Sequence, residues 1–216
     1  MPITKTITLY QFAELSDKAK EKARDWLREL EAIDFDPYWE QYETAAKLLG
    51  IELDAREIGR THAGKAIYRS DIRYSGFYSQ GDGASFVGRY SFAPDCSKAI
   101  RKEFPKDETL HKIADQLTVL ATARRLLGLP SITAKIEQSD SHYYHKYTMR
   151  LDCEDADGEG VREEDEETLS ELMRDFAQWI YDGLQEDYDY RLSDEALDET
   201  MEANEYTFTE DGKRED

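Results

Sequence analysis

Carboxylates form the clearest pattern for chemistry in this sequence, and they gather near its end. Glu167, Glu171 and Asp175 follow one another at four-residue steps. On a helix this spacing places successive carboxylates about 5 to 6 Å apart on one ridge. A row of negative charge suits the recognition of Lys and Arg on a partner protein. We therefore predict a partner-binding acidic ridge made of Glu163, Glu164, Glu167, Glu171, Asp175, Asp182 and Glu186.

A second candidate is the glycine-rich stretch SGFYSQGDGASF, residues 75–86. A glycine-rich loop that binds phosphate needs a helix N-terminus directly after it. Here the residues that follow Gly83 are ASFVGRYSF, which is typical of a strand. Its spacing also fails the GxGxxG and P-loop patterns. Asp82-Gly83 between two strands favours a two-residue hairpin turn with positive φ at both positions. A ligand or partner contact through Tyr78 and Asp82 stays open as the alternative.

Histidines give no convincing metal site, and we expect no cofactor. The four are His62, His111, His142 and His145. His142 and His145 lie three apart in a predicted strand, which would direct them to opposite faces, whereas metal ligands must converge. His111 is expected to pair with Asp115 on a helix surface. No hydrolase, metalloprotease or calcium motif is present.

These side chains are to be positioned by an α+β fold. Alternating and helical periodicities predict an antiparallel sheet from residues 51–92 and 131–152, with helices packed on one face and an acidic C-terminal helical segment. Strands are predicted over residues 5–10, 51–58, 65–74, 84–92, 131–138 and 142–152. Helices are predicted over residues 17–33, 37–49, 96–104, 108–129, 167–190 and 193–206. Residues 153–167 are predicted to be a loop, and residues 209–216 to be frayed.

One face of each long predicted helix is apolar. In residues 108–129 we expect a buried face made of Leu110, Ile113, Ala114, Leu117, Leu120 and Ala121. In residues 167–190 the corresponding stripe is Leu169, Leu172, Met173, Phe176, Ile180 and Leu184. This stripe implies that the acidic segment packs on the body and is not a disordered tail.

The net charge of −20 is unevenly distributed. Residues 1–151 carry 23 Lys and Arg against 22 Asp and Glu, whereas residues 152–216 carry 5 against 26. We expect a single domain over residues 1–216, with a near-neutral body to residue 151 and a strongly acidic helical segment after it. Such a field repels nucleic acid and attracts basic partners. The alternative is that the acidity only confers solubility.

Targeting signals and cysteine pairing give little constraint. No apolar run approaches the roughly 20 residues that span a membrane, and the first residues lack the pattern of a signal peptide, so we expect a cytoplasmic protein. Cys96 and Cys153 stand far apart, with no CxxC or Cys/His cluster beside either. We expect both to be buried thiols.

Three stretches together carry a family resemblance: LYQFAELSDKAKEKARDWLRE, SGFYSQGDGASF and SDEALDETMEANEYTFTEDG. Their order and sequence resemble a family of small proteins of tailed bacteriophages, prophages and some bacteria, of which some members are labelled antitoxins of toxin–antitoxin systems. The resemblance implies a bacterial or phage setting in the cytoplasm. It implies no catalytic residues.

Three functional hypotheses follow. The first is a non-enzymatic acidic protein that inhibits a basic nucleic-acid-handling host defence protein by DNA mimicry, of the anti-CRISPR or antirestriction type, without binding nucleic acid or membrane itself. DNA carries one negative charge per about 1.7 Å of axis, and a carboxylate ridge could compete for the same groove. The second is an antitoxin that covers a basic toxin. The third is an enzyme with an unrecognised site. The sequence leaves the oligomeric state open.

Overall fold

The computed structural model describes residues 6–30, 36–139 and 143–215, which form two compact units. The sheet unit comprises residues 36–184, and the terminal unit comprises the described parts of residues 1–35 and 185–216. The predicted single domain over residues 1–216 stays a prediction. The division into units does not follow the change in charge at residue 151, because the acidic segment contributes to both.

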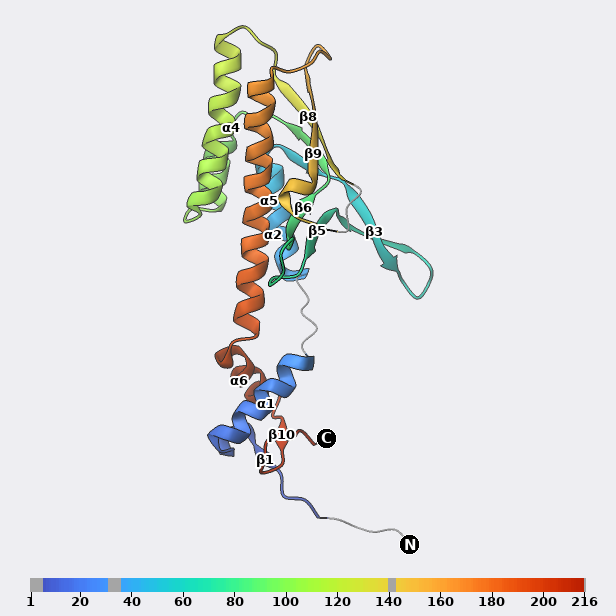
Figure 1. The fold of residues 1–216 in the computed structure, drawn as a ribbon, viewed down its shortest axis with the longest axis vertical. Coiled ribbons are helices and arrows are strands. Elements are labelled where there is room, and N and C mark those ends of the chain that lie inside the picture. The colour runs from blue at the N-terminus through green and yellow to red at the C-terminus, as the bar shows by residue number, and fades with distance from the viewer. Residues whose placement is uncertain (1–5, 31–35, 140–142, 216) are drawn as a thin grey trace. The chain divides into compact units, whose positions relative to one another are not determined.

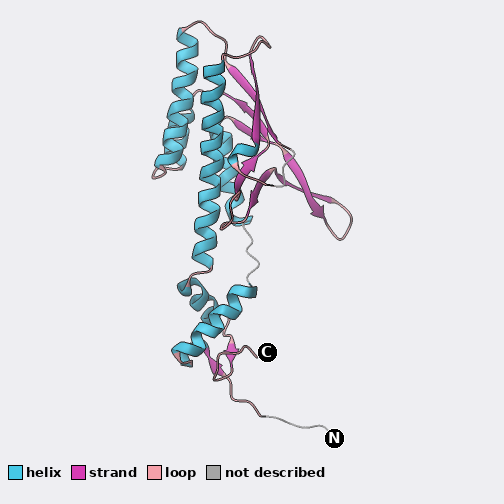
Figure 2. Cartoon of the chain, viewed as in Figure 1, coloured by secondary structure: helices cyan, strands magenta, loops and turns pink. Residues whose placement is uncertain are grey.

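The sheet unit confirms the predicted α+β class. Its main sheet is antiparallel, in the order β2 (Ile51–Leu53), β7 (Gly88–Ser91), β8 (Ile132–Gln138) and β9 (Met149–Asp155). Helices cover one face of the strands (Figures 1 and 2). They are α2 (Asp36–Leu49), α3 (Cys96–Glu103), α4 (Glu108–Leu126) and the first part of α5 (Glu163–Arg191). Along β8 every second residue is buried and the residues between are exposed, as expected for a half-buried strand.

Two hairpins accompany this sheet. Strands β3 (Ala55–Arg60) and β4 (Ala66–Ser70) pair with each other, and every residue of β3 is exposed. Figure 1 shows this hairpin projecting away from the main sheet. Strands β5 (Ile72–Ser75) and β6 (Gly83–Phe86) form the second hairpin, and β6 is buried throughout.

The turn predicted at Asp82-Gly83 is wrong in detail. Ser75 pairs with Gly83, so Gly83 lies in β6 and residues 76–82 form the connection. Positive φ occurs at Gly76 and Gly81, at 37° and 100°, and not at Gly83. Asp82 organises the longer loop, because its Oδ2 accepts the backbone N–H groups of Tyr78 and Ser79 at 2.8 and 2.6 Å. Such side-chain to backbone bonds compete with a tight turn.

Helix α5 is longer than predicted. It begins at Glu163, so the loop predicted over residues 153–167 is wrong for its last part, and β9 occupies its start. The acidic first turn favours this start because carboxylates stabilise the positive end of the helix dipole. The predicted apolar stripe is confirmed, since all six of its residues are buried.

Helix α4 is buried only over its first half. Leu110, Ile113, Ala114 and Leu117 are buried as predicted, but Leu120 and Ala121 are not, so that part of the prediction is wrong. Of residues 118–127, only Arg124 is buried. The second half of α4 therefore has no apolar core residue of its own.

An ion pair takes the place of that missing core. Arg124 Nη1 donates to Asp165 Oδ2 at 2.5 Å, and Arg124 Nε donates to the carbonyl of Pro130 at 2.8 Å. Both side chains of the pair are less than a tenth exposed. Arg162 adds two-pronged hydrogen bonds to the same carboxylate at 2.8 to 3.0 Å. The pair joins the last turn of α4 to the first turn of α5.

A second polar contact joins the N-terminus of α4 to the middle of α5. Asp107 Oδ1 accepts the N–H of Leu110 at 2.9 Å and so caps α4. Its Oδ2 accepts the indole N–H of Trp179 on α5 at 2.7 Å. The two helices are thus antiparallel neighbours with a polar contact at each end of α4.

The terminal unit has its own small core. Helix α1 (Asp17–Leu30) packs beside α6 (Asp194–Ala203), and β1 (Tyr10–Gln11) pairs with β10 (Thr207–Phe208). Arg24 binds Asp198 through two hydrogen bonds of 2.7 Å each, and this contact raises the pKa of Arg24. The core residues are Phe12, Leu15, Ala19, Ala23, Leu27, Leu197, Met201 and Phe208.

Predictions at the two termini need correction. Residues 6–9 are not a strand, and residue 5 lies outside the described residues. The helix predicted to residue 33 is described only to Leu30, which is exposed. Residues 209–215 are not frayed, because Thr209 N–H bonds to Lys213 O and Phe208 bridges Arg214. Gly212 adopts φ +81°, and a Cβ there would lie 2.1 Å from the carbonyl oxygen of Ala19, so the close packing requires glycine.

The strand predicted over residues 142–152 begins later than expected. A 3-10 helix, η2 (Lys146–Thr148), precedes β9, and residue 142 lies outside the described residues. His145 caps this turn, because its Nδ1 accepts the N–H of Tyr147 at 3.2 Å. Local capping here competes with strand pairing.

We expect Gly83→Val to destabilise the protein, for a different reason than a turn. A Cβ at Gly83 would lie 2.5 Å from His145 Cβ and 2.8 Å from its Cα. Overpacking of this kind lowers the free energy of unfolding by about 1 to 3 kcal/mol. The control is Gly59→Val in β3, where nothing lies within 4 Å of the added atom. Equal shifts of the urea midpoint in the two variants would contradict the close contact.

Asp165→Ala should lower the free energy of unfolding by about 3 to 5 kcal/mol, because it leaves the buried charge of Arg124 without its partner. Adding Arg124→Met should restore most of the loss, since an apolar side chain of similar size needs no partner. The control Asp175→Ala, at a half-buried carboxylate of α5 that makes no ion pair among the described residues, should change the free energy by about 0.5 kcal/mol or less. Urea titrations of the four chains measure these values. A loss for Asp165→Ala as small as that for Asp175→Ala would show that the pair does not hold α4.

Candidate functional site

The predicted acidic ridge forms one wall of an open groove between α4 and α5, within the sheet unit. The groove encloses about 830 Å³. Its α5 wall carries Glu164, Glu167, Glu171 and Asp175. Its α4 wall carries Gln116, Val119, Leu120, Ala123 and Leu127. We call this feature the acidic groove.

Three carboxylates of the α5 wall are unneutralised. Within the described part of the chain, the carboxylates of Glu164, Glu167 and Asp175 make no hydrogen bond or ion pair. Glu171 differs, because Arg174 Nη1 lies 2.5 Å from its Oε1. Like charges at this spacing disfavour a helix by a few tenths of a kcal/mol per pair. The buried stripe on the opposite side of α5 offsets this repulsion.

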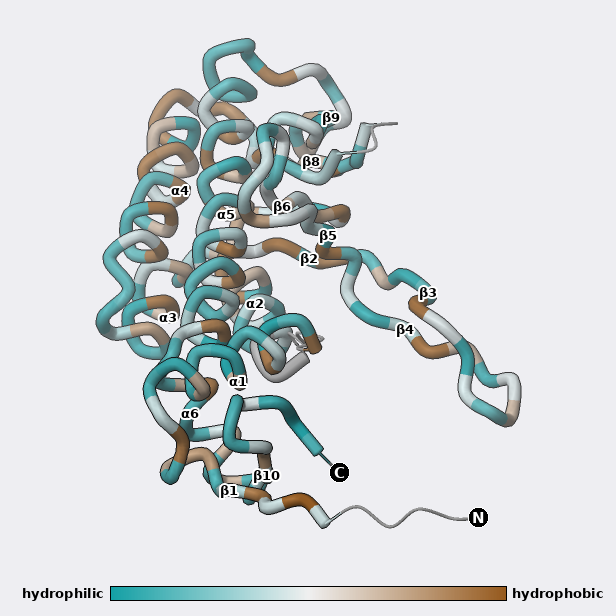
Figure 3. Tube along the Cα trace, turned by 60° about the horizontal axis from the view of Figure 1, so that its bottom comes forward, coloured by the Kyte–Doolittle hydropathy of each residue, from teal (hydrophilic) through white to brown (hydrophobic). Residues whose placement is uncertain are grey.

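The α4 wall of the acidic groove is apolar and exposed. Val119 and Leu127 keep 67% and 62% of their surface, and the neighbouring Leu126 keeps 78%. Figure 3 shows hydrophobic positions recurring along α4. A contiguous exposed apolar surface beside a charged rim is typical of an interaction site. The groove therefore offers one negative wall and one apolar wall.

The other predicted ridge residues lie elsewhere. Glu163 is exposed in the first turn of α5 and does not line the acidic groove. Asp182 accepts a hydrogen bond from Gln178 Nε2 at 2.7 Å. Glu186 is exposed on the part of α5 that belongs to the terminal unit. The structure therefore brings four of the seven predicted carboxylates together.

The glycine-rich stretch is occupied by its own hydrogen bonds. Asp82 Oδ2 accepts two backbone N–H groups of its own loop, which favours a structural role for this carboxylate. Tyr78 is 76% exposed beside it. Whether these two residues contact a partner stays a prediction.

Histidines and cysteines do not assemble a site among the described residues. No group of three His, Cys, Asp or Glu side chains there could hold a metal ion. His111 does not pair with Asp115 as predicted, because its Nε2 lies 2.7 Å from Phe104 O while Asp115 binds Arg101. Both thiols are free and buried, as predicted. Burial, with smaller contributions from Glu166 and Asp152, raises the pKa of Cys153 to about 11.

Sequence reasoning missed Asp165, Arg124 and the apolar wall. Asp165 stands among five consecutive acidic residues, and nothing local distinguishes the one that is buried. The sequence of α4 does indicate an exposed apolar wall, because its apolar residues are too many for one helical face. Val119, Leu126 and Leu127 lie off the predicted stripe.

Comparison with known proteins gives one match. A family model described as a domain of unknown function, DUF8835, matches residues 35–194. The match covers the sheet unit and stops within the second stretch of the terminal unit. No curated protein and no solved structure matches the sequence. No helix among the described residues has the length and apolar character needed to cross a bilayer.

We expect Cys153 to react slowly with iodoacetamide at neutral pH, because a thiol with a pKa near 11 is almost wholly protonated and only the thiolate attacks. Its burial adds to the effect. Alkylation of the Cys96→Ser chain, followed by mass spectrometry with and without urea, measures the rate. The Cys153→Ser chain reports Cys96 in the same way. A folded chain that reacts as fast as the unfolded one would make Cys153 a candidate nucleophile.

Proposed function

The chain belongs to the DUF8835 family, and we propose that it is a non-enzymatic interaction protein whose acidic groove engages a basic partner protein. The observation that carries the proposal is the row Glu164, Glu167 and Asp175, whose carboxylates make no ion pair among the described residues, while Arg162 in the same groove is bound to Asp165. A partner that brings Lys or Arg to this wall would relieve the repulsion along it. The row is presented on a helix that six buried apolar residues hold in place. Such preorganisation lowers the cost of binding.

The partner that we propose is a nucleic-acid-handling protein of a bacterial host, inhibited by DNA mimicry in the host cytoplasm. Proteins that bind DNA recognise its phosphates largely through Lys and Arg, and a fixed row of carboxylates can compete for those side chains. The likeness to phage and prophage proteins supports this setting. An inhibitor of host defence, of the anti-CRISPR or antirestriction type, fits both the row of carboxylates and the phage setting.

The apolar wall refines the expected contact. A surface that only imitated DNA phosphates would need negative charge alone. It would not need the exposed apolar side chains of Val119 and Leu127 opposite the carboxylates. A partner surface with basic residues along one edge and aliphatic side chains along the other matches both walls. An amphipathic basic helix has this character and is a common occupant of helical grooves.

Two rival functions remain distinguishable. An antitoxin would use the same groove to cover a basic toxin, and it would rescue growth when the two are expressed together from neighbouring genes. An enzyme would turn over a substrate, which neither the inhibitor nor the antitoxin does.

Reversing the unneutralised row should abolish partner binding without unfolding the protein. The test chain carries Glu164→Lys, Glu167→Lys and Asp175→Lys. The control carries Glu195→Lys, Glu199→Lys and Glu202→Lys on α6, which changes net charge equally at residues that are exposed and unpaired within the described chain. We expect the test chain to bind a Lys/Leu amphipathic peptide at least about tenfold more weakly, because each exposed ion pair contributes roughly 0.2 to 1 kcal/mol and reversal adds repulsion.

Isothermal titration at rising salt, beside affinity capture from host lysate, compares the three chains. Binding by the wild type should weaken as salt screens charges over roughly 8 to 10 Å. The control should bind like the wild type. If both variants lose binding equally, overall charge and not the groove is responsible. If neither loses it, the row is only a solvated face.

A further inference from the structure

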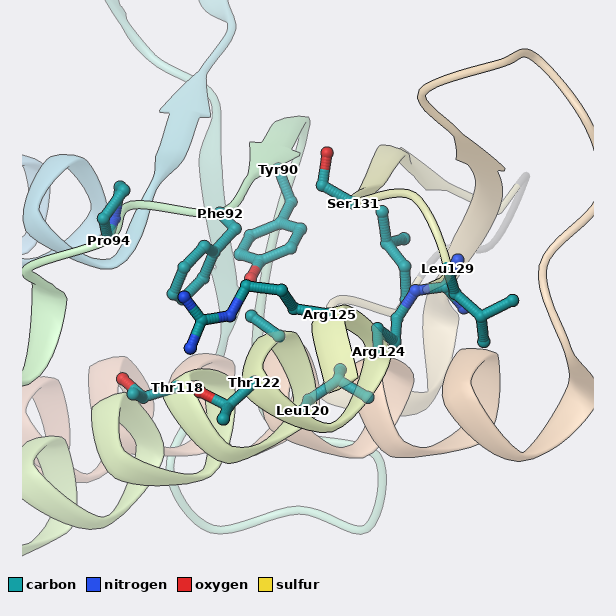
Figure 4. A pocket seen from close by; sticks show the side chains of 12 residues that line it. Tyr90, Phe92, Pro94, Thr118, Leu120, Thr122, Arg124, Arg125, Leu129 and Ser131 are labelled. Carbon is teal, nitrogen blue, oxygen red and sulfur yellow. The ribbon is translucent and has the colours of Figure 1, made fainter. Parts of the chain in front are cut away.

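A second concavity lies on the other flank of α4, between its C-terminal half and the ends of β7 and β8. It encloses about 500 Å³, within the range of small-molecule sites. The rings of Tyr90 and Phe92 line it, as Figure 4 shows, and Leu120 and Ala121 of α4 are also among its lining residues. Leu129 and Ile132 add further apolar surface. We call this feature the α4 pocket.

A single cation without a partner faces this apolar space. Within the described residues, the guanidinium of Arg125 makes no hydrogen bond, ion pair or ring contact. Figure 4 shows its side chain lying across the α4 pocket. Arg124, which also lines the pocket, is already engaged by Asp165 and Pro130. No carboxylate is among the described residues that line the pocket.

A protonated hydroxyl lies in the same pocket. Tyr90 is only 3% exposed, and burial raises the pKa of its phenol well above the ordinary value. The group therefore keeps its proton at neutral pH and can donate a hydrogen bond. Figure 4 shows this hydroxyl directed toward the side where Arg125 lies. A guanidinium and an O–H donor beside apolar walls suit a carboxylate that is attached to an apolar body.

An ordinary structural role for Arg125 does not account for this arrangement. A cation in the last turn of a helix stabilises the negative end of the dipole, and Arg124 and Arg125 both stand there. Stabilisation of the helix dipole needs only a positive charge near the end of the helix. It does not require aromatic walls or the buried hydroxyl of Tyr90 in the same pocket. The pocket and the unpaired cation are therefore two separate observations that point to one ligand class.

We propose that the α4 pocket binds a small amphipathic monoanion, a carboxylate that carries an aliphatic chain or a flat ring. Arg125 holds the carboxylate, Tyr90 donates to it, and the apolar body lies between Phe92 and Leu120. This proposal is separate from the acidic groove, which takes a basic protein on the opposite flank of the helix. Failure of either proposal leaves the other in place.

Decanoate and naphthalene carboxylate are suitable probes, and decanol is the uncharged control. The wild type should bind at least one carboxylate by isothermal titration. Arg125→Gln should weaken that binding about tenfold or more, because a charge-assisted hydrogen bond is lost, while leaving decanol binding unchanged. Arg125→Lys should restore part of it. Lys112→Gln, at an exposed position of α4 outside the pocket, should bind like the wild type.

Ala121→Phe fills the pocket and should remove binding of both the carboxylates and decanol. If a thermal melt shows that this variant is unfolded, Leu129→Trp fills the space from the connecting loop instead. Lack of binding of both carboxylates to the wild type would overturn the proposal. So would equal affinity in the wild type and Arg125→Gln, or undiminished binding in a folded, filled variant.

Discussion

The buried ion pair between Arg124 and Asp165 is the contact on which the second half of α4 depends. Apolar packing holds this helix as far as Leu117. Beyond Leu117, Arg124 is the only buried side chain among residues 118–127. Desolvation of two charges is costly, and it is offset only when geometry and further hydrogen bonds are good. Arg162 and the carbonyl of Pro130 provide those bonds. The pair also fixes the position of the two flanks of α4, on which the acidic groove and the α4 pocket are built.

Much of this fold could be predicted from periodicity. The stripe on α5 and the four strands of the main sheet follow from local spacing and residue type and are observed, although the last strand begins later than predicted. Some of the errors arise from local side-chain to backbone hydrogen bonds, as at Asp82 and His145, and others arise from tertiary contact. Gly83 reads as a turn residue, yet it is a strand glycine because His145 packs against it. Residues 209–215 read as a polar end, yet Gly212 fits closely over α1.

Only part of the candidate site could be predicted from the sequence. Spacing alone identifies the row of carboxylates, because a helix places such residues on one ridge. It does not tell which acidic residue is buried, and Asp165 is distinguished only by the arginine that arrives from a helix about forty positions earlier. The apolar wall is equally invisible to a single-helix argument. By their residue type Val119 and Leu127 would be expected in a core, yet in the described structure both remain more than half exposed beside α5.

The mixed character of α4 has a thermal consequence. Opening its second half would expose little apolar surface of the helix itself, because Arg124 is the only one of residues 118–127 that is buried. The heat-capacity change of unfolding scales with exposed apolar area, so this local opening should carry a small one and a flat stability curve. Charged pairs also lose less to desolvation as temperature rises. The local stability of the wall shared by the acidic groove and the α4 pocket should therefore change less on warming and cooling than the stability of the apolar core beneath it.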